Sequence, residues 1–188
     1  INPGRVLRFT QNYLQSLVMN KTVKKIVSLF LIGAMAIPMA ACSKIQPIKP
    51  KDFGKALESA LDLDDDDYNE DKGSDYKYCS YYDDITAYCY QYDDEDDAYD
   101  QFDDIKDLYD DMMDDKDFSG KTKVVTGKDF GYILLNGEGD SDDFIDDDFY
   151  GGFYYTGDTF VVIYTTSTSD KKIQMVKDLI SELGYPKP

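Results

Sequence analysis

The sequence predicts an α+β domain in which helices pack on one face of an antiparallel sheet of about six strands. Runs rich in tyrosine and β-branched residues come in consecutive pairs separated by short turns, which indicates hairpins and therefore antiparallel pairing. Three other segments carry apolar residues at the spacing of an amphipathic helix. The expected element order is α-β-β-α-β-β-β-β-α.

The first helix is expected to follow residue 51, because apolar side chains recur there at helical spacing: Phe53, Leu57, Ala60 and Leu61. It ends at the acidic run Asp64–Asp67. Residues 68–75 are then expected to form a polar loop. Residues 75–82 and 85–92 have the composition of a tyrosine-rich hairpin.

The register of this hairpin depends on its loop. A loop of Asp83 and Asp84 alone would place Cys79 and Cys89 on opposite faces of the sheet, whereas a loop of residues 83–85 would place them directly opposite each other. A disulfide and the second register are therefore linked, because a slip of one residue inverts a strand. An even pair of cysteines outside the cytoplasm favours the disulfide, and two buried free thiols are the alternative.

In the register that allows the disulfide, one face of the hairpin carries both cysteines and the other carries six tyrosines. These are Tyr76, Tyr78, Tyr82, Tyr88, Tyr90 and Tyr92. Such a face would suit the stacking of sugar rings or of a protein partner. The alternative places the tyrosines in the core beneath the helices and the cysteine face outside, and the frequency of buried tyrosine favours that alternative.

The second helix begins after Asp93 or Asp94, either of which can cap it, and runs to about Lys116. Its apolar stripe consists of Ala98, Phe102, Ile105, Tyr109 and Met112. Aspartates at i,i+4 spacing crowd the rest of its surface, and each such pair costs roughly a few tenths of a kcal/mol. Packing of the stripe must therefore stabilise this helix.

Two further hairpins and a helix complete the domain. The first hairpin is expected at residues 121–126 and 129–136, and the second at 149–156 and 159–166, with an acidic loop at 137–148 between them. Gly157-Asp158 suits a type II′ turn, since glycine comes first. The last helix begins at Ser169 or Asp170 and ends before Gly184 and Pro186; its apolar face consists of Ile173, Val176, Leu179, Ile180 and Leu183.

Near the N-terminus, Lys21, Lys24 and Lys25 precede the apolar run Ile26–Ala41 and then Cys42. The run is shorter than the roughly 20 residues that span a bilayer. Residues 19–43 resemble a bacterial lipoprotein signal peptide, with Met39-Ala40-Ala41-Cys42 as the lipobox and Met39 where leucine is usual. An ordinary secretory signal or a membrane helix is the alternative.

The resemblance implies that residues 19–41 are removed and that the thiol of Cys42 carries a diacylglyceryl group. The protein is then expected to be extracytoplasmic and anchored to the cell membrane by this lipid. Residues 1–18 are interpreted as a mis-called upstream extension, 42–51 as a tether and 52–188 as one acidic domain. In size and element order the chain is also similar to small uncharacterised lipoproteins of Gram-positive gut bacteria.

The charge of the chain limits its partners. Without residues 1–41, 15 of the 20 basic residues and all 38 acidic ones remain, so the formal charge changes from −18 to −23. A field of this sign repels nucleic acid and disfavours direct adhesion to anionic lipid headgroups. It favours cations, basic partners or simple solubility.

The composition also excludes several chemistries. Without histidine, neither a Ser-His-Asp nor a Cys-His constellation can form, and two cysteines cannot complete a zinc site. The acidic segments Asp62–Asp71 and Asp140–Asp148 depart from the EF-hand pattern, although Ca²⁺ binding stays open. We therefore expect a non-catalytic envelope protein that binds a protein or a cell-wall polymer. A Ca²⁺-binding protein is the first alternative and a carboxylate-dependent hydrolase the second.

Overall fold

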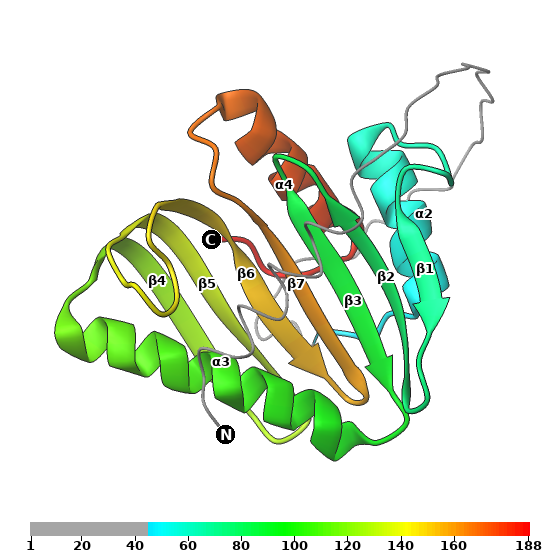
Figure 1. Ribbon diagram of the computed structural model, residues 1–188, viewed down its shortest axis with the longest axis horizontal. Helices are drawn as coiled ribbons and strands as arrows, with labels where there is room; N and C mark the ends of the chain where they lie inside the picture. Colours follow the sequence, from blue (N-terminus) through cyan, green and yellow to red (C-terminus); the bar gives the residue numbers. More distant parts are fainter. Residues whose placement is uncertain (1–44) are drawn as a thin grey trace.

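The computed structural model describes residues 45–188, so the predicted signal peptide and Cys42 lie outside the described residues. Within them, seven strands form one antiparallel sheet, accompanied by three helices (Figure 1). The α+β class is confirmed. The elements are α2 (Pro50–Leu61), β1 (Asn69–Lys72), β2 (Tyr76–Tyr82), β3 (Thr86–Tyr92), α3 (Glu95–Asp115), β4 (Phe118–Thr126), β5 (Phe130–Gly139), β6 (Asp148–Thr156), β7 (Thr159–Thr165) and α4 (Asp170–Glu182).

The sheet has the strand order β1-β2-β3-β7-β6-β5-β4, one strand more than the sequence predicts. The additional strand is β1, which occupies the segment expected to be a polar loop. All four of its residues, Asn69–Lys72, are exposed, and it pairs along one edge of β2. Without a buried side, β1 has no alternation of apolar and polar residues from which a strand could be predicted.

The prediction that the helices share one face of the sheet is wrong. Helices α2 and α4 pack together on one face, whereas α3 crosses the other (Figure 1). The central strands are therefore buried on both faces: Leu134 and Ile163 belong to the core beneath α2 and α4, and Ile133 and Val162 to the core beneath α3. Continuous apolar runs in β5 and β7 are the sequence signal for such double burial.

Part of the predicted tether is packed into the domain. Ile45 is 1% exposed and belongs to the core beneath α2 and α4. The Tyr185 hydroxyl donates to the Gln46 carbonyl at 2.9 Å, and Pro50 already begins α2. The tether prediction is therefore wrong for residues 45–51.

Several element ends match the sequence signals. Asp94 caps α3, with its carboxylate accepting from the Asp96 N–H at 3.0 Å. Gly157 has φ +54° and joins β6 to β7, as a type II′ turn requires of its first central residue. Gly184, with φ +70°, follows the end of α4, and the Tyr185 N–H donates to the Ile180 carbonyl. Residues next to each turn or cap in the sequence therefore determine its structure.

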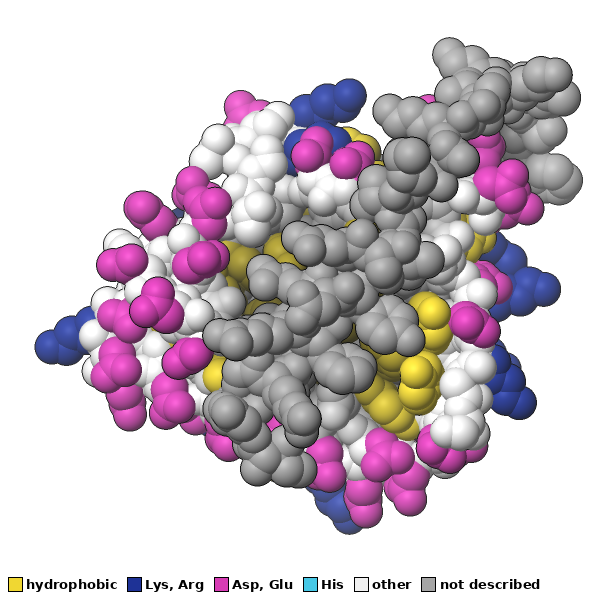
Figure 2. Space-filling model, in the orientation of Figure 1, with side chains coloured by type: hydrophobic (Ala, Val, Ile, Leu, Met, Phe, Trp, Pro, Cys, Tyr) yellow, Lys and Arg dark blue, Asp and Glu magenta, His cyan; other side chains and the backbone are white. Residues whose placement is uncertain are grey.

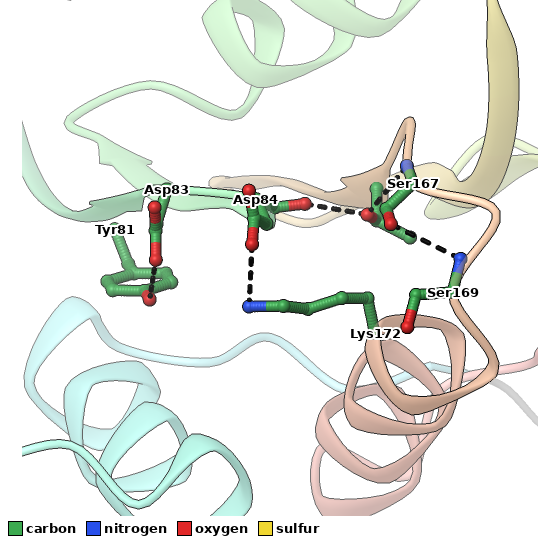
Figure 3. Close-up of polar contacts among 7 residues, drawn as sticks. Tyr81, Asp83, Asp84, Ser167, Ser169 and Lys172 are labelled. Carbon is green, nitrogen blue, oxygen red and sulfur yellow. Dashed lines mark hydrogen bonds and ion pairs between the residues drawn. The ribbon is translucent and has the colours of Figure 1, made fainter.

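Polar contacts join the β2–β3 turn to the start of α4 (Figure 3). The Lys172 ammonium group lies 2.9 Å from the Asp84 carboxylate, and the Thr165 hydroxyl donates to the Asp84 carbonyl at 2.6 Å. The Ser167 N–H in turn donates to the Thr165 hydroxyl at 3.1 Å. These contacts hold the β2–β3 turn at one end of the sheet and so support the register of the β2–β3 hairpin.

Candidate functional site

The β2–β3 hairpin has the register in which Cys79 faces Cys89, as the longer loop predicts. The Asp83 N–H donates to the Ile85 carbonyl and the Asp93 N–H to the Asp75 carbonyl, which marks the pairs at both ends as hydrogen-bonded. Hydrogen-bonded and non-hydrogen-bonded pairs alternate along an antiparallel ladder. The cysteines therefore form a hydrogen-bonded pair, and the residues on the opposite face form the non-hydrogen-bonded pairs whose side chains come closest.

The six tyrosines project from that opposite face, as the sequence predicts for this register. Tyr76 is paired with Tyr92 and Tyr78 with Tyr90. We call the six side chains the tyrosine face; they are Tyr76, Tyr78, Tyr82, Tyr88, Tyr90 and Tyr92.

The rings of the tyrosine face form one continuous array. Tyr90 is at its centre: its ring stacks on Tyr78 at 5.5 Å and on Tyr92 at 6.0 Å, with interplanar angles of 26° and 20°. Tyr76 and Tyr88 approach Tyr90 edge-on at 5.4 and 5.7 Å. Tyr82 joins the array through Tyr88 at 6.2 Å. These mutual contacts hold the rings in place without a covering helix from α2 or α4.

The alternative that places the cysteine face outside is wrong, whereas part of the tyrosine face does pack against a core. The cysteine face lies beneath α2 and α4, and Cys79 and Cys89 are both fully buried. On the tyrosine face, Tyr82 is 36% exposed and the other rings are half-buried. Tyr88 and Tyr92 pack at one side against the core beneath α3. The array is thus partly open, as a binding surface must be.

The hydroxyls of Tyr82, Tyr88 and Tyr92 are neutral at physiological pH. Burial raises the pKa of Tyr82, Tyr88 and Tyr92 above the ordinary value near 10, and neighbouring tyrosines raise it further. The carboxylate of Asp97 adds to the rise in the pKa of Tyr92. The face therefore presents flat apolar rings with uncharged hydroxyl groups at their tips.

Acidic residues border the tyrosine face. Asp71 is paired with Tyr78 from the neighbouring strand β1, and Asp97 lies on α3 close enough to Tyr92 to affect its pKa. Figure 2 shows hydrophobic side chains gathered over β2 and β3, with acidic side chains along the adjacent margin below them. A neutral or cationic ligand suits this border, whereas a polyanion would be repelled.

The two cysteines are free thiols in the structure. Burial raises the pKa of Cys79 to about 12 and that of Cys89 well above its ordinary value, so both thiols stay protonated and unreactive at neutral pH. Directly opposite residues of a hydrogen-bonded pair have Cα atoms about 5.5 Å apart, which lies within the range of disulfides. The register is confirmed, and the disulfide itself stays a prediction.

The acidic segments form ordinary turns. The Asp64 N–H donates to the Asp67 carboxylate at 3.0 Å, and the Ser141 N–H donates to the Ile145 carbonyl at 2.9 Å. Among residues 45–188, no three acidic or cysteine side chains are grouped so that they could hold a metal ion. Ca²⁺ binding stays a prediction without a placed site.

Comparison with known proteins does not assign this chain to a family. No family model matches the chain, and no curated protein matches it either. A solved structure of a GTP-binding regulator from Thermotoga maritima aligns with 70% of this chain and 90% of its own, at 11% identity and a TM-score of 0.34. The extracellular domain of PknH from Mycobacterium tuberculosis aligns with 75% of this chain and 99% of its own, at 9% identity and a TM-score of 0.28. Likenesses this weak carry no functional argument.

Proposed function

We propose that this chain is a lipid-anchored protein of the bacterial cell envelope, and that its domain acts by binding rather than by catalysis. The lipobox resemblance at Cys42 supports the anchor. Within residues 45–188, no helix is both long and apolar enough to cross a bilayer. The observation that carries the binding function is the tyrosine face, a continuous and partly open array of neutral rings.

The ligand that suits the tyrosine face best is a glycan of neutral or amino sugars. A sugar ring has an apolar face of C–H groups and a rim of hydroxyl groups, which matches an aromatic ring that ends in a hydroxyl. The stacked rings of Tyr78, Tyr90 and Tyr92 supply several such surfaces side by side. The acidic border around Asp71 and Asp97 disfavours polyanionic polymers and nucleic acid. A cell-wall polysaccharide is therefore the proposed partner.

The side chains of this region support no catalytic role. The chain has no histidine, and its two described cysteines are buried and protonated. The role that we propose is therefore non-catalytic.

Sedimentation with insoluble, purified cell-wall glycan tests the proposal. Tyr82→Ala and Tyr78→Ala should each weaken binding about fivefold, since stacking on one aromatic ring is typically worth about 1 kcal/mol. Tyr99→Ala is the matched control, because Tyr99 is 37% exposed on α3 and belongs to no pair within the tyrosine face. Thermal melts of each variant separate lost binding from lost folding.

Two results would reject the proposal. In one, Tyr82→Ala binds glycan as tightly as the original protein. In the other, Tyr78→Ala and Tyr90→Ala unfold the domain, which would make the tyrosine face a structural element. Capture of a defined protein by the tyrosine face, with no glycan binding, would replace the glycan with a protein partner.

A further inference from the structure

A cavity of about 490 Å³ opens at the first turn of α2, beside the ends of β1 and β2. Its lining is unusual for a chain this acidic, because four of the 20 basic residues converge on it. They are Lys49, Lys51, Lys72 and Lys77. Figure 2 shows lysine side chains beside β1, with acidic side chains next to them. We call this cavity the lysine pocket.

Each lysine of the pocket occupies an unfavourable position. Lys72 lies directly opposite Lys77 across the β1–β2 ladder, where like charges repel. Lys49 is the N-cap of α2 and Lys51 lies in its first turn, where the helix dipole disfavours positive charge. All four side chains are exposed, so each cost is small, but together they give one cavity an excess of positive charge that suits an anion.

Within the described part of the chain, the pocket lysines make no direct ion pair. The ion pairs within residues 45–188 engage other lysines, namely Lys55, Lys106 and Lys172, and no ammonium group of the pocket makes an ion pair or a hydrogen bond there. Lys49 and Lys51 act on Asp52 only at a distance, where they help to lower its pKa.

Two carboxylates also line the pocket and reduce its charge. The Asp71 carboxylate accepts a hydrogen bond from the Lys72 backbone N–H at 2.7 Å, and Glu70 faces Cys79 across the ladder. Against four ammonium groups they leave a formal charge of +2 in the cavity. A phosphate or phosphodiester group, small and anionic, fits a cavity of this size and charge.

We propose that the lysine pocket binds the phosphate of an anionic phospholipid headgroup and so orients the domain on the membrane. This proposal rests on the proposed lipid anchor, because Lys49 follows Cys42 by seven residues. Seven residues reach at most about 25 Å, so an anchor at Cys42 keeps the pocket close to the bilayer. Lysines near an anionic leaflet gain attraction within about one Debye length, although the whole domain is acidic.

The lysine pocket adjoins the tyrosine face. Lys77 projects to the same face of β2 as Cys79, which is the face covered by α2, and the tyrosine face is on the opposite side. Tyr78 of the tyrosine face also lines the pocket, so the two proposed sites meet at this strand.

Vesicle sedimentation tests the lysine pocket with the processed chain, residues 42–188, carrying Cys42→Ser so that no lipid anchors it. The probes are vesicles of phosphatidylcholine alone and of phosphatidylcholine with phosphatidylglycerol. We expect binding only to the second, and a loss of about tenfold or more in Lys72→Gln/Lys77→Gln. The matched control is Lys121→Gln/Lys128→Gln, which removes the same charge from exposed positions at the far edge of the sheet.

The outcomes separate the sources of phosphate. If the control loses as much binding as the pocket variant, general electrostatics explains it and the pocket proposal is overturned. If inorganic phosphate raises the melting temperature of the original protein but not of the pocket variant, and no vesicle binds, the site takes free phosphate and the membrane role is overturned. Because this chain carries no lipid, its result is independent of whether Cys42 is an anchor in cells.

Discussion

Cys79 faces Cys89 directly across the β2–β3 ladder, at a hydrogen-bonded pair, and both thiols are buried beneath α2 and α4. This pairing fixes which side chains form the tyrosine face. A shift of one residue would exchange the two faces of one strand and break the array around Tyr90. The cysteine pair and the proposed binding surface are thus two consequences of one register.

The first prediction is that Cys79 and Cys89 form a disulfide in protein exported to an oxidising compartment. The bridge would close a short loop and should raise the free energy of unfolding by about 2–3 kcal/mol over the reduced protein. Mass spectrometry of the intact protein should show a gain of two hydrogen atoms on reduction. Reductant should lower the melting temperature of the original protein but not of Cys79→Ala/Cys89→Ala. An unchanged mass would mean that the pair stays as buried thiols.

How much the sequence could predict depends on whether a feature is local. The cap at Asp94, the turn at Gly157 and the register around Cys79 rest on neighbouring residues, and the structure confirms them. Strand β1 could not be predicted, since its exposed residues Asn69–Lys72 carry no apolar pattern and only backbone pairing holds them. Its polar composition is equally typical of a loop.

The arrangement of the layers was harder to predict. The tyrosine-rich hairpin has an aromatic face and a small-residue face, and either could have met the helices. Helices α2 and α4 cover the small face, because Cys79, Ala87 and Cys89 allow close approach. The lysine pocket could not be predicted at all, because Lys49 and Lys77 lie 28 residues apart and only the fold brings them together.

The second prediction concerns the cap of α3. The Asp94 carboxylate accepts a hydrogen bond from the Asp96 N–H, and no other side chain in the described chain caps this helix. Asp94→Ala should therefore lower the free energy of unfolding by about 1 kcal/mol, whereas Asp94→Asn should nearly preserve it. Urea denaturation measures both. Equal stability of the alanine variant would show that the cap bond is not formed in solution.

The third prediction concerns Asp104, which is also on α3. Unlike the loss of Asp94, the loss of its charge should stabilise the domain. Burial and the neighbouring carboxylates of Asp100 and Asp107 raise the pKa of Asp104, so its charge is unfavourable in the folded state. Asp104→Asn should raise the free energy of unfolding by about 0.5 kcal/mol at low salt. The gain should shrink at high ionic strength, and also on mild acidification, because the folded state binds the Asp104 proton more tightly. A gain that is independent of salt would point to packing instead.

The fourth prediction concerns the anchor. Cys42 lies outside the described residues, and its lipidation is tested in cells rather than by structure. Labelled fatty acid should be incorporated into the original protein but not into Cys42→Ala, and only the original should fractionate with membranes. Membrane fractionation of Cys42→Ala without label would instead indicate an uncleaved membrane helix.

The fifth prediction is a loss of stability at alkaline pH. Burial raises the pKa of Cys79 to about 12 and that of Tyr81 to about 12, and it raises the pKa of Tyr88 and Tyr154 well above 10. In the unfolded chain cysteine titrates near 8.5 and tyrosine near 10, so above these values the unfolded state loses its protons first. It then binds fewer protons than the native state, and stability falls as pH rises.

With Cys79 and Cys89 kept reduced, the free energy of unfolding should accordingly be constant up to about pH 8.5 and then decline between about pH 9 and 12. Urea midpoints at several pH values measure the decline, and tyrosinate absorbance follows the ionisation. The variant Cys79→Ala/Cys89→Ala should stay level until about pH 10, because only its tyrosines contribute. Smooth ionisation of all tyrosines near pH 10 with the fold intact would contradict the burial of Tyr88 and Tyr154. A single step in absorbance that coincides with unfolding would instead show that the folded sheet keeps these hydroxyls protonated.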